Sequence, residues 1–121
     1  MNTFNMNGIL WTIKIVDNSF NDNNYLVDRT GTLTIATTDP ETHSVYIDNR
    51  LTYDQLIPVL IHELSHCCMI SYGLINDVHR IINQEKYIEM EEWICNFVMK
   101  HGYEILQSVS NIINSLYLHP L

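Results

Sequence analysis

Hydrophobic residues in the first half of the chain alternate with polar ones at the two-residue period typical of β-strands. The longest such run covers residues 9–16 and has fairly apolar side chains on both faces. Shorter runs of the same kind lie at residues 25–28, 32–37 and 44–48. The asparagine-rich stretch at 17–24 predicts a loop, and Pro40 marks a turn at 38–41. Because short turns join such strands, we expect a small, mainly antiparallel sheet.

The second half has helical signals, and the clearest is the start of a long helix. Thr52 is followed three residues later by Gln55, as in a capping box, and Gly73 predicts the helix end after Tyr72. Pro58 lies inside this segment, where it removes a backbone donor. The sequence therefore predicts either a kink at Pro58 or a helix that begins nearer to it.

Two more helices are predicted, over about 84–101 and 103–117, with Gly102 between them. The last has an apolar stripe, which we expect to face the core. Its members are Ile105, Val109, Ile112 and Leu116. The predicted fold is α+β, with the small sheet packed on about three helices. At 121 residues the chain, 1–121, is expected to be a single domain.

The charge and the cysteine content indicate which partners and which cellular compartment to expect. The net charge is −8 and no cluster of Lys and Arg exists, which argues against nucleic acids and anionic membrane surfaces as partners. The start lacks a signal peptide, and no apolar run is long enough to span a bilayer. The three cysteines, Cys67, Cys68 and Cys95, are expected to be free thiols. We therefore expect a cytoplasmic protein.

The candidate chemistry lies in the H-E-x-x-H motif of the first predicted helix, His62-Glu63-Leu64-Ser65-His66. Residues four apart share a helix face, so His62 and His66 can bind one metal ion. Glu63 lies about 100° around the helix from His62. From there it can act as general base on a water that the ion holds.

A third protein ligand is expected from the next helix, where two glutamates are adjacent. With Glu92 at the metal, Asn96 also faces inward and Glu91 lies nearer water. With Glu91 at the metal, Asn96 turns away. Helical geometry alone does not choose between them.

The two helical motifs resemble those of ImmA/IrrE-type metallopeptidases, which contain H-E-x-x-H followed by E-x-x-A-N-x-F. Here the second motif is Glu92-Trp93-Ile94-Cys95-Asn96, with Cys95 in place of Ala and Val98 in place of Phe. The strand at 44–48 and the helix start at Leu51-Thr52 are also similar. Small bacteriophage relatives have about this size.

The resemblance implies a minimal zincin-like domain that binds Zn²⁺ through His62, His66 and Glu92. It implies Glu63 as general base and Asn96 as a neighbour of the ligands. The expected activity is zinc-dependent hydrolysis of a peptide bond in a protein substrate, with Glu63 activating a zinc-bound water. By resemblance, that substrate is a repressor or another host or phage regulatory protein.

Several alternatives stay open from the sequence. Tyr72, His79 and Tyr87 are all candidates for stabilising the oxyanion. A non-enzymatic zinc-bound protein could sequester a partner, and an amidase could act on a small or cell-wall substrate. A deep, narrow pocket would favour the amidase, whereas a groove beside an edge strand would favour a bound peptide. The oligomeric state is not determined by the sequence.

Overall fold

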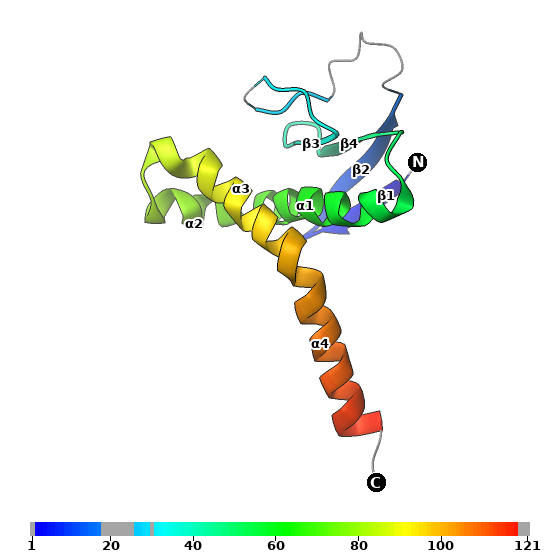
Figure 1. Cartoon of the computed structure of the whole chain (residues 1–121). Coiled ribbons are helices and arrows are strands. Elements are labelled where there is room, and N and C mark those ends of the chain that lie inside the picture. The colour runs from blue at the N-terminus through cyan, green and yellow to red at the C-terminus, as the bar shows by residue number, and fades with distance from the viewer. Residues whose placement is uncertain (1, 18–25, 30, 119–121) are drawn as a thin grey trace.

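A four-stranded sheet forms one layer of the protein (Figure 1). The computed structural model describes residues 2–17, 26–29 and 31–118. The strands are Asn2–Met6 (β1), Ile9–Val16 (β2), Ala36–Asp39 (β3) and Ser44–Asp48 (β4), in the order β1-β2-β4-β3. The β1–β2 and β3–β4 pairs are antiparallel, and β2–β4 is parallel. The predicted α+β fold with a mainly antiparallel sheet is confirmed.

The predicted bounds of the third strand are wrong. β3 begins at Ala36, and Leu33, predicted to be a strand residue, is 80% exposed and forms only a single bridge to Val27. The turn after β3 is two residues later than predicted because the Asp39 carboxylate caps it. It accepts hydrogen bonds from the Glu41 amide and the Thr42 hydroxyl, both at 2.9 Å.

Other strand predictions have different outcomes. The loop predicted at 17–24 lies outside the described residues except for residue 17, and the run at 25–28 is described only from residue 26. The first strand, β1, was not predicted. Its apolar Phe4 and Met6 pack on the core, but two alternating residues are too few to indicate a strand.

Helix α1, Tyr53–Ser71, packs on the sheet and carries the H-E-x-x-H motif (Figure 1). Its capping box is confirmed: the Gln55 amide donates to Thr52 Oγ1 at 3.3 Å, and the Thr52 amide donates to Gln55 Oε1 at 2.9 Å. Pro58 lies within the helix, so a start near Pro58 is wrong. The core beneath α1 is built by Trp11, Ala36, Val45, Ile47 and Cys67.

A short helix α2, Leu74–Ile81, follows α1 and was not predicted. A 3₁₀ turn at Gln84–Lys86 (η1) then leads into α3, Tyr87–Phe97. A second apolar cluster, formed by Met69, Val78 and Cys95, joins α1, α2 and α3. This cluster fixes α3 beside the H-E-x-x-H motif.

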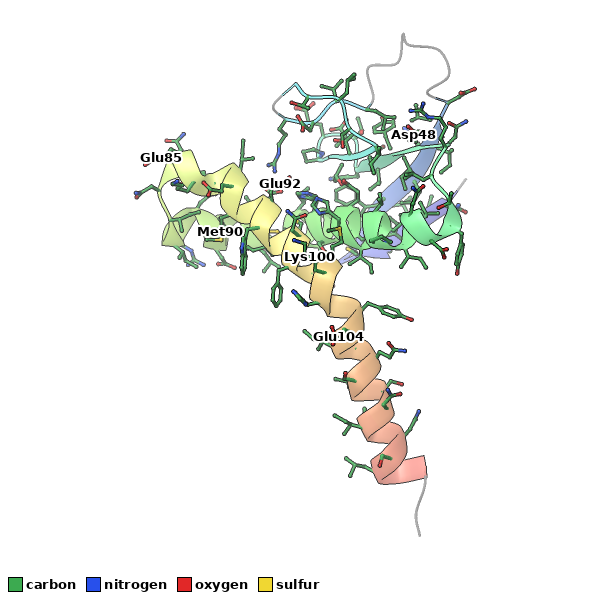
Figure 2. The ribbon with its side chains drawn as sticks, viewed as in Figure 1. Asp48, Glu85, Met90, Glu92, Lys100 and Glu104 are labelled. Carbon is green, nitrogen blue, oxygen red and sulfur yellow. The ribbon has the colours of Figure 1, made fainter. Side chains whose placement is uncertain are left out.

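The predicted helix end at Gly102 is wrong. A π-helical turn, Val98–Gly102 (η2), joins α3 to α4, Tyr103–Ile113, and a further π turn, Asn114–Leu118 (η3), extends it. Gly102 has φ −62° and ψ −44°, an ordinary right-handed helical conformation, so it does not stop the helix. From α4 onward this continuous helix projects away from the sheet and α1 (Figures 1 and 2). Its apolar stripe is therefore exposed, and the prediction that it faces the core is wrong.

Within the described parts of the chain, no helix combines the length and the apolar character that crossing a membrane requires.

Candidate metal centre

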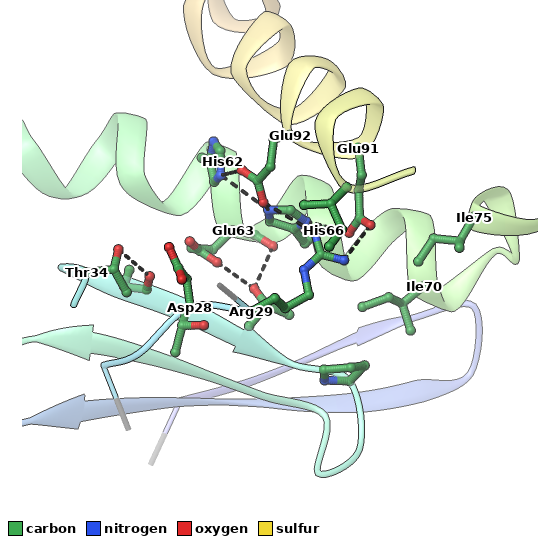
Figure 3. Close-up of a pocket in the computed structure, with 15 residues that line it drawn as sticks. Asp28, Arg29, Thr34, His62, Glu63, His66, Ile70, Ile75, Glu91 and Glu92 are labelled. Atoms are coloured by element: carbon green, nitrogen blue, oxygen red, sulfur yellow. Dashed lines mark hydrogen bonds and ion pairs between the residues drawn. The ribbon is translucent and has the colours of Figure 1, made fainter. Parts of the chain in front are cut away.

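His62 and His66 of α1 and Glu92 of α3 form a compact cluster of metal-binding atoms (Figure 3). The Nε2 atoms of the two histidines are 3.2 Å apart. Glu92 Oε1 is 3.2 Å from His66 Nε2, and Glu92 Oε2 is 3.3 Å from His62 Nε2. The three residues named from the sequence are thus brought together in a cluster that could hold a metal ion.

Glu91 lies behind His66 and contacts its other ring nitrogen. His66 Nδ1 is 2.8 Å from Glu91 Oε1. Because a carboxylate can only accept, this bond requires the proton on Nδ1 and leaves Nε2 facing Glu92 and His62. Glu91 is 6% exposed, so the prediction that it lies nearer water is wrong. Both adjacent glutamates therefore contact the histidines: Glu92 contacts their Nε2 atoms, and Glu91 contacts Nδ1 of His66.

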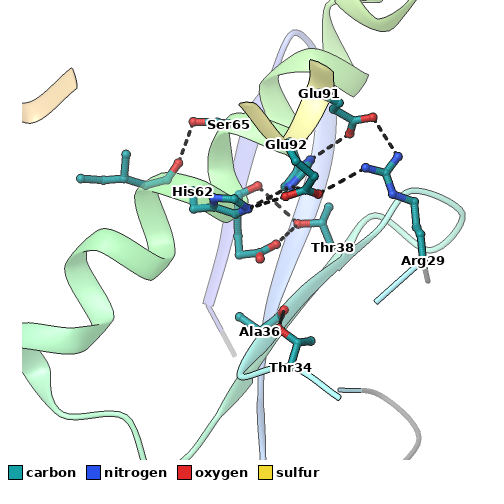
Figure 4. A network of polar contacts seen from close by, with 11 residues as sticks. Arg29, Thr34, Ala36, Thr38, His62, Ser65, Glu91 and Glu92 are labelled. Atoms are coloured by element: carbon teal, nitrogen blue, oxygen red, sulfur yellow. Dashed lines mark hydrogen bonds and ion pairs between the residues drawn. The ribbon is translucent and has the colours of Figure 1, made fainter. Parts of the chain in front are cut away.

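Arg29 connects the two glutamates from a distant loop (Figure 4). Its Nη1 donates to Glu91 Oε2 at 2.8 Å, and its Nη2 is 3.4 Å from Glu92 Oε1. Burial disfavours the charged form of Glu91, but hydrogen bonds from His66 and Arg29 outweigh it and hold the Glu91 pKa below its usual value. Both carboxylates can therefore remain anionic in a partly dry environment.

The cluster favours positive charge at its centre. Hydrogen bonds from His62 and His66 hold the pKa of Glu92 well below its usual range. Burial lowers the pKa of His66, but contacts with Cys95, Glu91 and Glu92 outweigh burial and raise that pKa well above its ordinary value. An environment that stabilises a proton so strongly would also stabilise a metal cation, which competes with the proton for Nε2.

Glu63, the predicted general base, is 6% exposed and is oriented by β3. Thr38 Oγ1 donates to Glu63 Oε2 at 2.6 Å and is 3.3 Å from the Glu63 carbonyl oxygen. Figure 4 shows Thr38 on the strand that faces His62 and Glu92. Sequence reasoning assigned Thr38 to a turn, and no local pattern could have revealed this contact between residues 25 positions apart.

These groups line one pocket, together with apolar side chains (Figure 3). The wall is formed by the loop that carries Asp28 and Arg29, by β3, and by helices α1, α2 and α3. Its large aliphatic side chains are Ile70, Ile75 and Ile88. β3 is an edge strand of the described sheet, so the pocket lies along a sheet edge.

Other residues considered from the sequence lie elsewhere. Tyr72, His79 and Tyr87 are all described, and none of them lines the pocket. The Tyr87 hydroxyl instead donates to the His79 carbonyl at 3.2 Å. Asn96 is exposed and is also absent from the described pocket wall. The basic side chain that does reach the pocket is Arg29, which the sequence did not single out.

The three cysteines are free, as predicted. Burial, with the nearby Glu63 charge, raises the pKa of Cys67 to about 12, so Cys67 behaves as a neutral core thiol. Cys95 is fully buried and belongs to the apolar cluster between the helices.

No model of a known protein family matches the chain, and no curated protein matches it in sequence.

Proposed function

We propose that the protein is a zinc-dependent metallopeptidase. The cluster of His62, His66 and Glu92 carries this proposal, because one ligand atom from each residue lies within 4.8 Å of the others. The two histidine Nε2 atoms, 3.2 Å apart, are at a separation that fits zinc. Two ligands about 2.0–2.1 Å from a tetrahedral zinc ion are about 3.3 Å apart. Two imidazoles and one carboxylate also leave a fourth position for water or substrate, as in catalytic zinc sites.

The surrounding residues have distinct roles in this proposal. Zinc, when bound, supplies a Lewis acid that polarises a carbonyl and lowers the pKa of a water ligand. Glu63 accepts the proton of the attacking water. Thr38 holds the Glu63 carboxylate in place, and Glu91 holds His66 in the tautomer that leaves Nε2 free. Arg29 fixes both glutamates and places a guanidinium charge in the pocket wall, where it would favour negative charge that develops on the substrate.

A peptide is the substrate best supported by the pocket. β3 is an edge strand, and an extended peptide can pair with such an edge by strand addition. The isoleucines of the wall would accept an apolar side chain of that peptide. This arrangement supports a peptidase over an amidase for small substrates. The resemblance to ImmA/IrrE-type enzymes would make the substrate a repressor or another regulatory protein.

Metal content tests the first half of the proposal. Wild type, Glu92→Gln and His66→Ala are purified and loaded under zinc-limited conditions. We expect one zinc per wild-type chain and much weaker retention in both variants. Absence of zinc from the wild type, even after zinc is supplied, would contradict the proposal. Zinc retained by Glu92→Gln but lost by His66→Ala would make Glu91 the third ligand.

Hydrolysis tests the second half. Zinc-loaded wild type and Glu63→Gln are incubated with a library of quenched fluorescent peptides that contain apolar residues. We expect wild-type cleavage and a loss of at least about 100-fold in Glu63→Gln at equal zinc content. Equal cleavage by the variant would exclude Glu63 as the base. Zinc binding without any cleavage would favour the alternative, a non-enzymatic protein that sequesters a partner.

A further inference from the structure

The helix beyond Gly102 carries an apolar face that the rest of the described chain leaves uncovered. The segments with which α4 has extensive contacts are η2 and η3, its own continuation. Six apolar side chains on it are 45–69% exposed: Ile105, Leu106, Val109, Ile112, Ile113 and Leu116. Figure 2 shows α4, from Glu104 onward, projecting away from the other elements. Contiguous exposed apolar surface of this kind marks an interaction site.

The spacing of these residues indicates what can cover them. Ile105, Val109, Ile112 and Leu116 are separated by four, three and four residues, the spacing of a coiled-coil seam. Such a seam packs against another helix with the same spacing. A second copy of this chain has that helix.

We propose that α4 pairs with α4 of a second copy in an antiparallel coiled coil. In this register Ile105 packs against Leu116 of the second copy, and Val109 packs against Ile112. Every seam residue then meets another seam residue, because the four-three-four spacing reads the same in both directions.

The residues beside the seam favour the antiparallel orientation. Leu106 and Ile113 each follow a seam isoleucine, and Ser108 and Ser115 each precede a seam residue. Antiparallel pairing places Leu106 against Ile113 on one flank and serine against serine on the other. Parallel pairing would instead place Ile113 against Ser108, which leaves apolar surface against hydroxyl groups.

Charge and area are both compatible with a second copy. Within α4 and η3, Glu104 is the single charged residue, so little electrostatic repulsion opposes the pairing of two such helices. Because these elements contain no Lys or Arg, an anionic lipid surface is a poor partner for them. Antiparallel pairing also places the rest of the two chains at opposite ends of the helix pair. This reduces the repulsion between two chains that each have a net charge of −8. The six residues are 45–69% exposed, which is roughly 600 Å² per copy, so a pair would bury at most about 1,200 Å², the lower end of the range of specific interfaces.

Light scattering on the purified full chain tests the proposal. We expect a mass twice the 14.2 kDa of one chain. Val109→Glu with Ile112→Glu should give the mass of one chain, with an unchanged near-ultraviolet circular dichroism spectrum from the buried Trp11. The matched control, Gln107→Glu with Asn114→Glu, adds the same charges to the opposite face and should stay dimeric. A single-chain mass for the wild type, or a dimer of the seam variant, would overturn the proposal.

Cysteine cross-linking tests the orientation. Ile105→Cys and Leu116→Cys chains are oxidised separately and as a mixture, with the wild type as a control for Cys67, Cys68 and Cys95. Antiparallel pairing predicts disulfide-linked dimers in the mixture and few in either variant alone. Cross-linking of each variant with itself would show parallel pairing and would overturn the proposed register.

Discussion

Glu91 and Glu92 are adjacent in the sequence but contact different atoms of the candidate metal centre. Glu92 contacts both Nε2 atoms of the histidines, and Glu91 contacts Nδ1 of His66. A partner on the far nitrogen fixes the ring and makes it a better ligand. The two carboxylates should therefore differ in how much metal affinity depends on them.

We expect Glu91→Gln to weaken zinc binding by about 10–100-fold, the usual effect of losing such a partner. Glu92→Gln should weaken it more, because it removes a charged ligand. Competition with a chromophoric chelator measures both effects. Glu89→Gln is the matched control, since Glu89 is exposed on the same helix, and it should leave the affinity unchanged. A greater loss in Glu91→Gln than in Glu92→Gln would assign the ligand role to Glu91.

Thr38 is the second residue whose role can be isolated. Thr38→Val keeps the shape of the side chain but leaves the buried Glu63 carboxylate without its hydroxyl donor. We expect a loss of about 1–3 kcal/mol in the free energy of unfolding. Urea denaturation measures this loss, and Thr38→Ser should restore most of the stability. Thr3→Val, at an exposed position of β1, is the control. Equal stability of Thr38→Val and wild type would show that this hydrogen bond is dispensable.

Local spacing explains which residues of the site could be predicted. His62, Glu63 and His66 share one helical motif, and Glu92 was chosen through a resemblance between short motifs. Arg29 and Thr38 come from other segments and reach the site through contacts 25 to 63 positions away. Such contacts depend on how the elements pack, and no periodicity along the chain encodes them.

At the scale of elements, the start of α1 determines where the H-E-x-x-H motif lies on the sheet. Thr52→Ala removes the acceptor for the Gln55 amide. We expect it to lower the free energy of unfolding by about 1 kcal/mol, the usual contribution of such a cap. Urea denaturation followed by circular dichroism measures this. An unchanged free energy would mean that tertiary packing alone fixes the helix start.

Most elements with a regular pattern were predicted, whereas β1 and α2 were not. β2, β4 and α1 lie close to their predicted positions. α2 has only eight residues, and its apolar residues, Leu74, Ile75, Val78 and Ile81, extend over only about two turns. Glycine at position 102 predicts a helix end because glycine often adopts positive φ, but here its φ is −62° and the helix continues. A glycine permits a helix end without requiring one.

At the scale of the whole molecule, the cluster joins α1 to α3 and, through Arg29, to the loop before β3. A ligand that binds only the folded chain stabilises it by mass action. At free zinc about 100-fold above Kd, this adds about 2.7 kcal/mol to the free energy of unfolding. For a domain of this size, Tm should rise by roughly 10 °C.

Differential scanning calorimetry with added zinc and with a chelator measures this shift. His62→Ala should show no comparable rise, because it lacks one of the three donors. Equal rises in wild type and His62→Ala would mean that zinc stabilises the chain at a different place.

The three candidate ligands come from two helices that are synthesised one after the other, α1 and α3. Two of them, His62 and His66, lie one helical turn apart, but the third follows 26 positions later, at residue 92. A nascent chain that has emerged only as far as α1 therefore offers the two histidines without Glu92. If the cluster binds a metal ion, the full ligand set exists only after α3 has left the ribosome and docked on α1. If the cluster is a peptidase centre, an incomplete chain that lacks α3 is inactive. Other nascent chains on the same polysome, which are still unfolded, are then not exposed to cleavage by it.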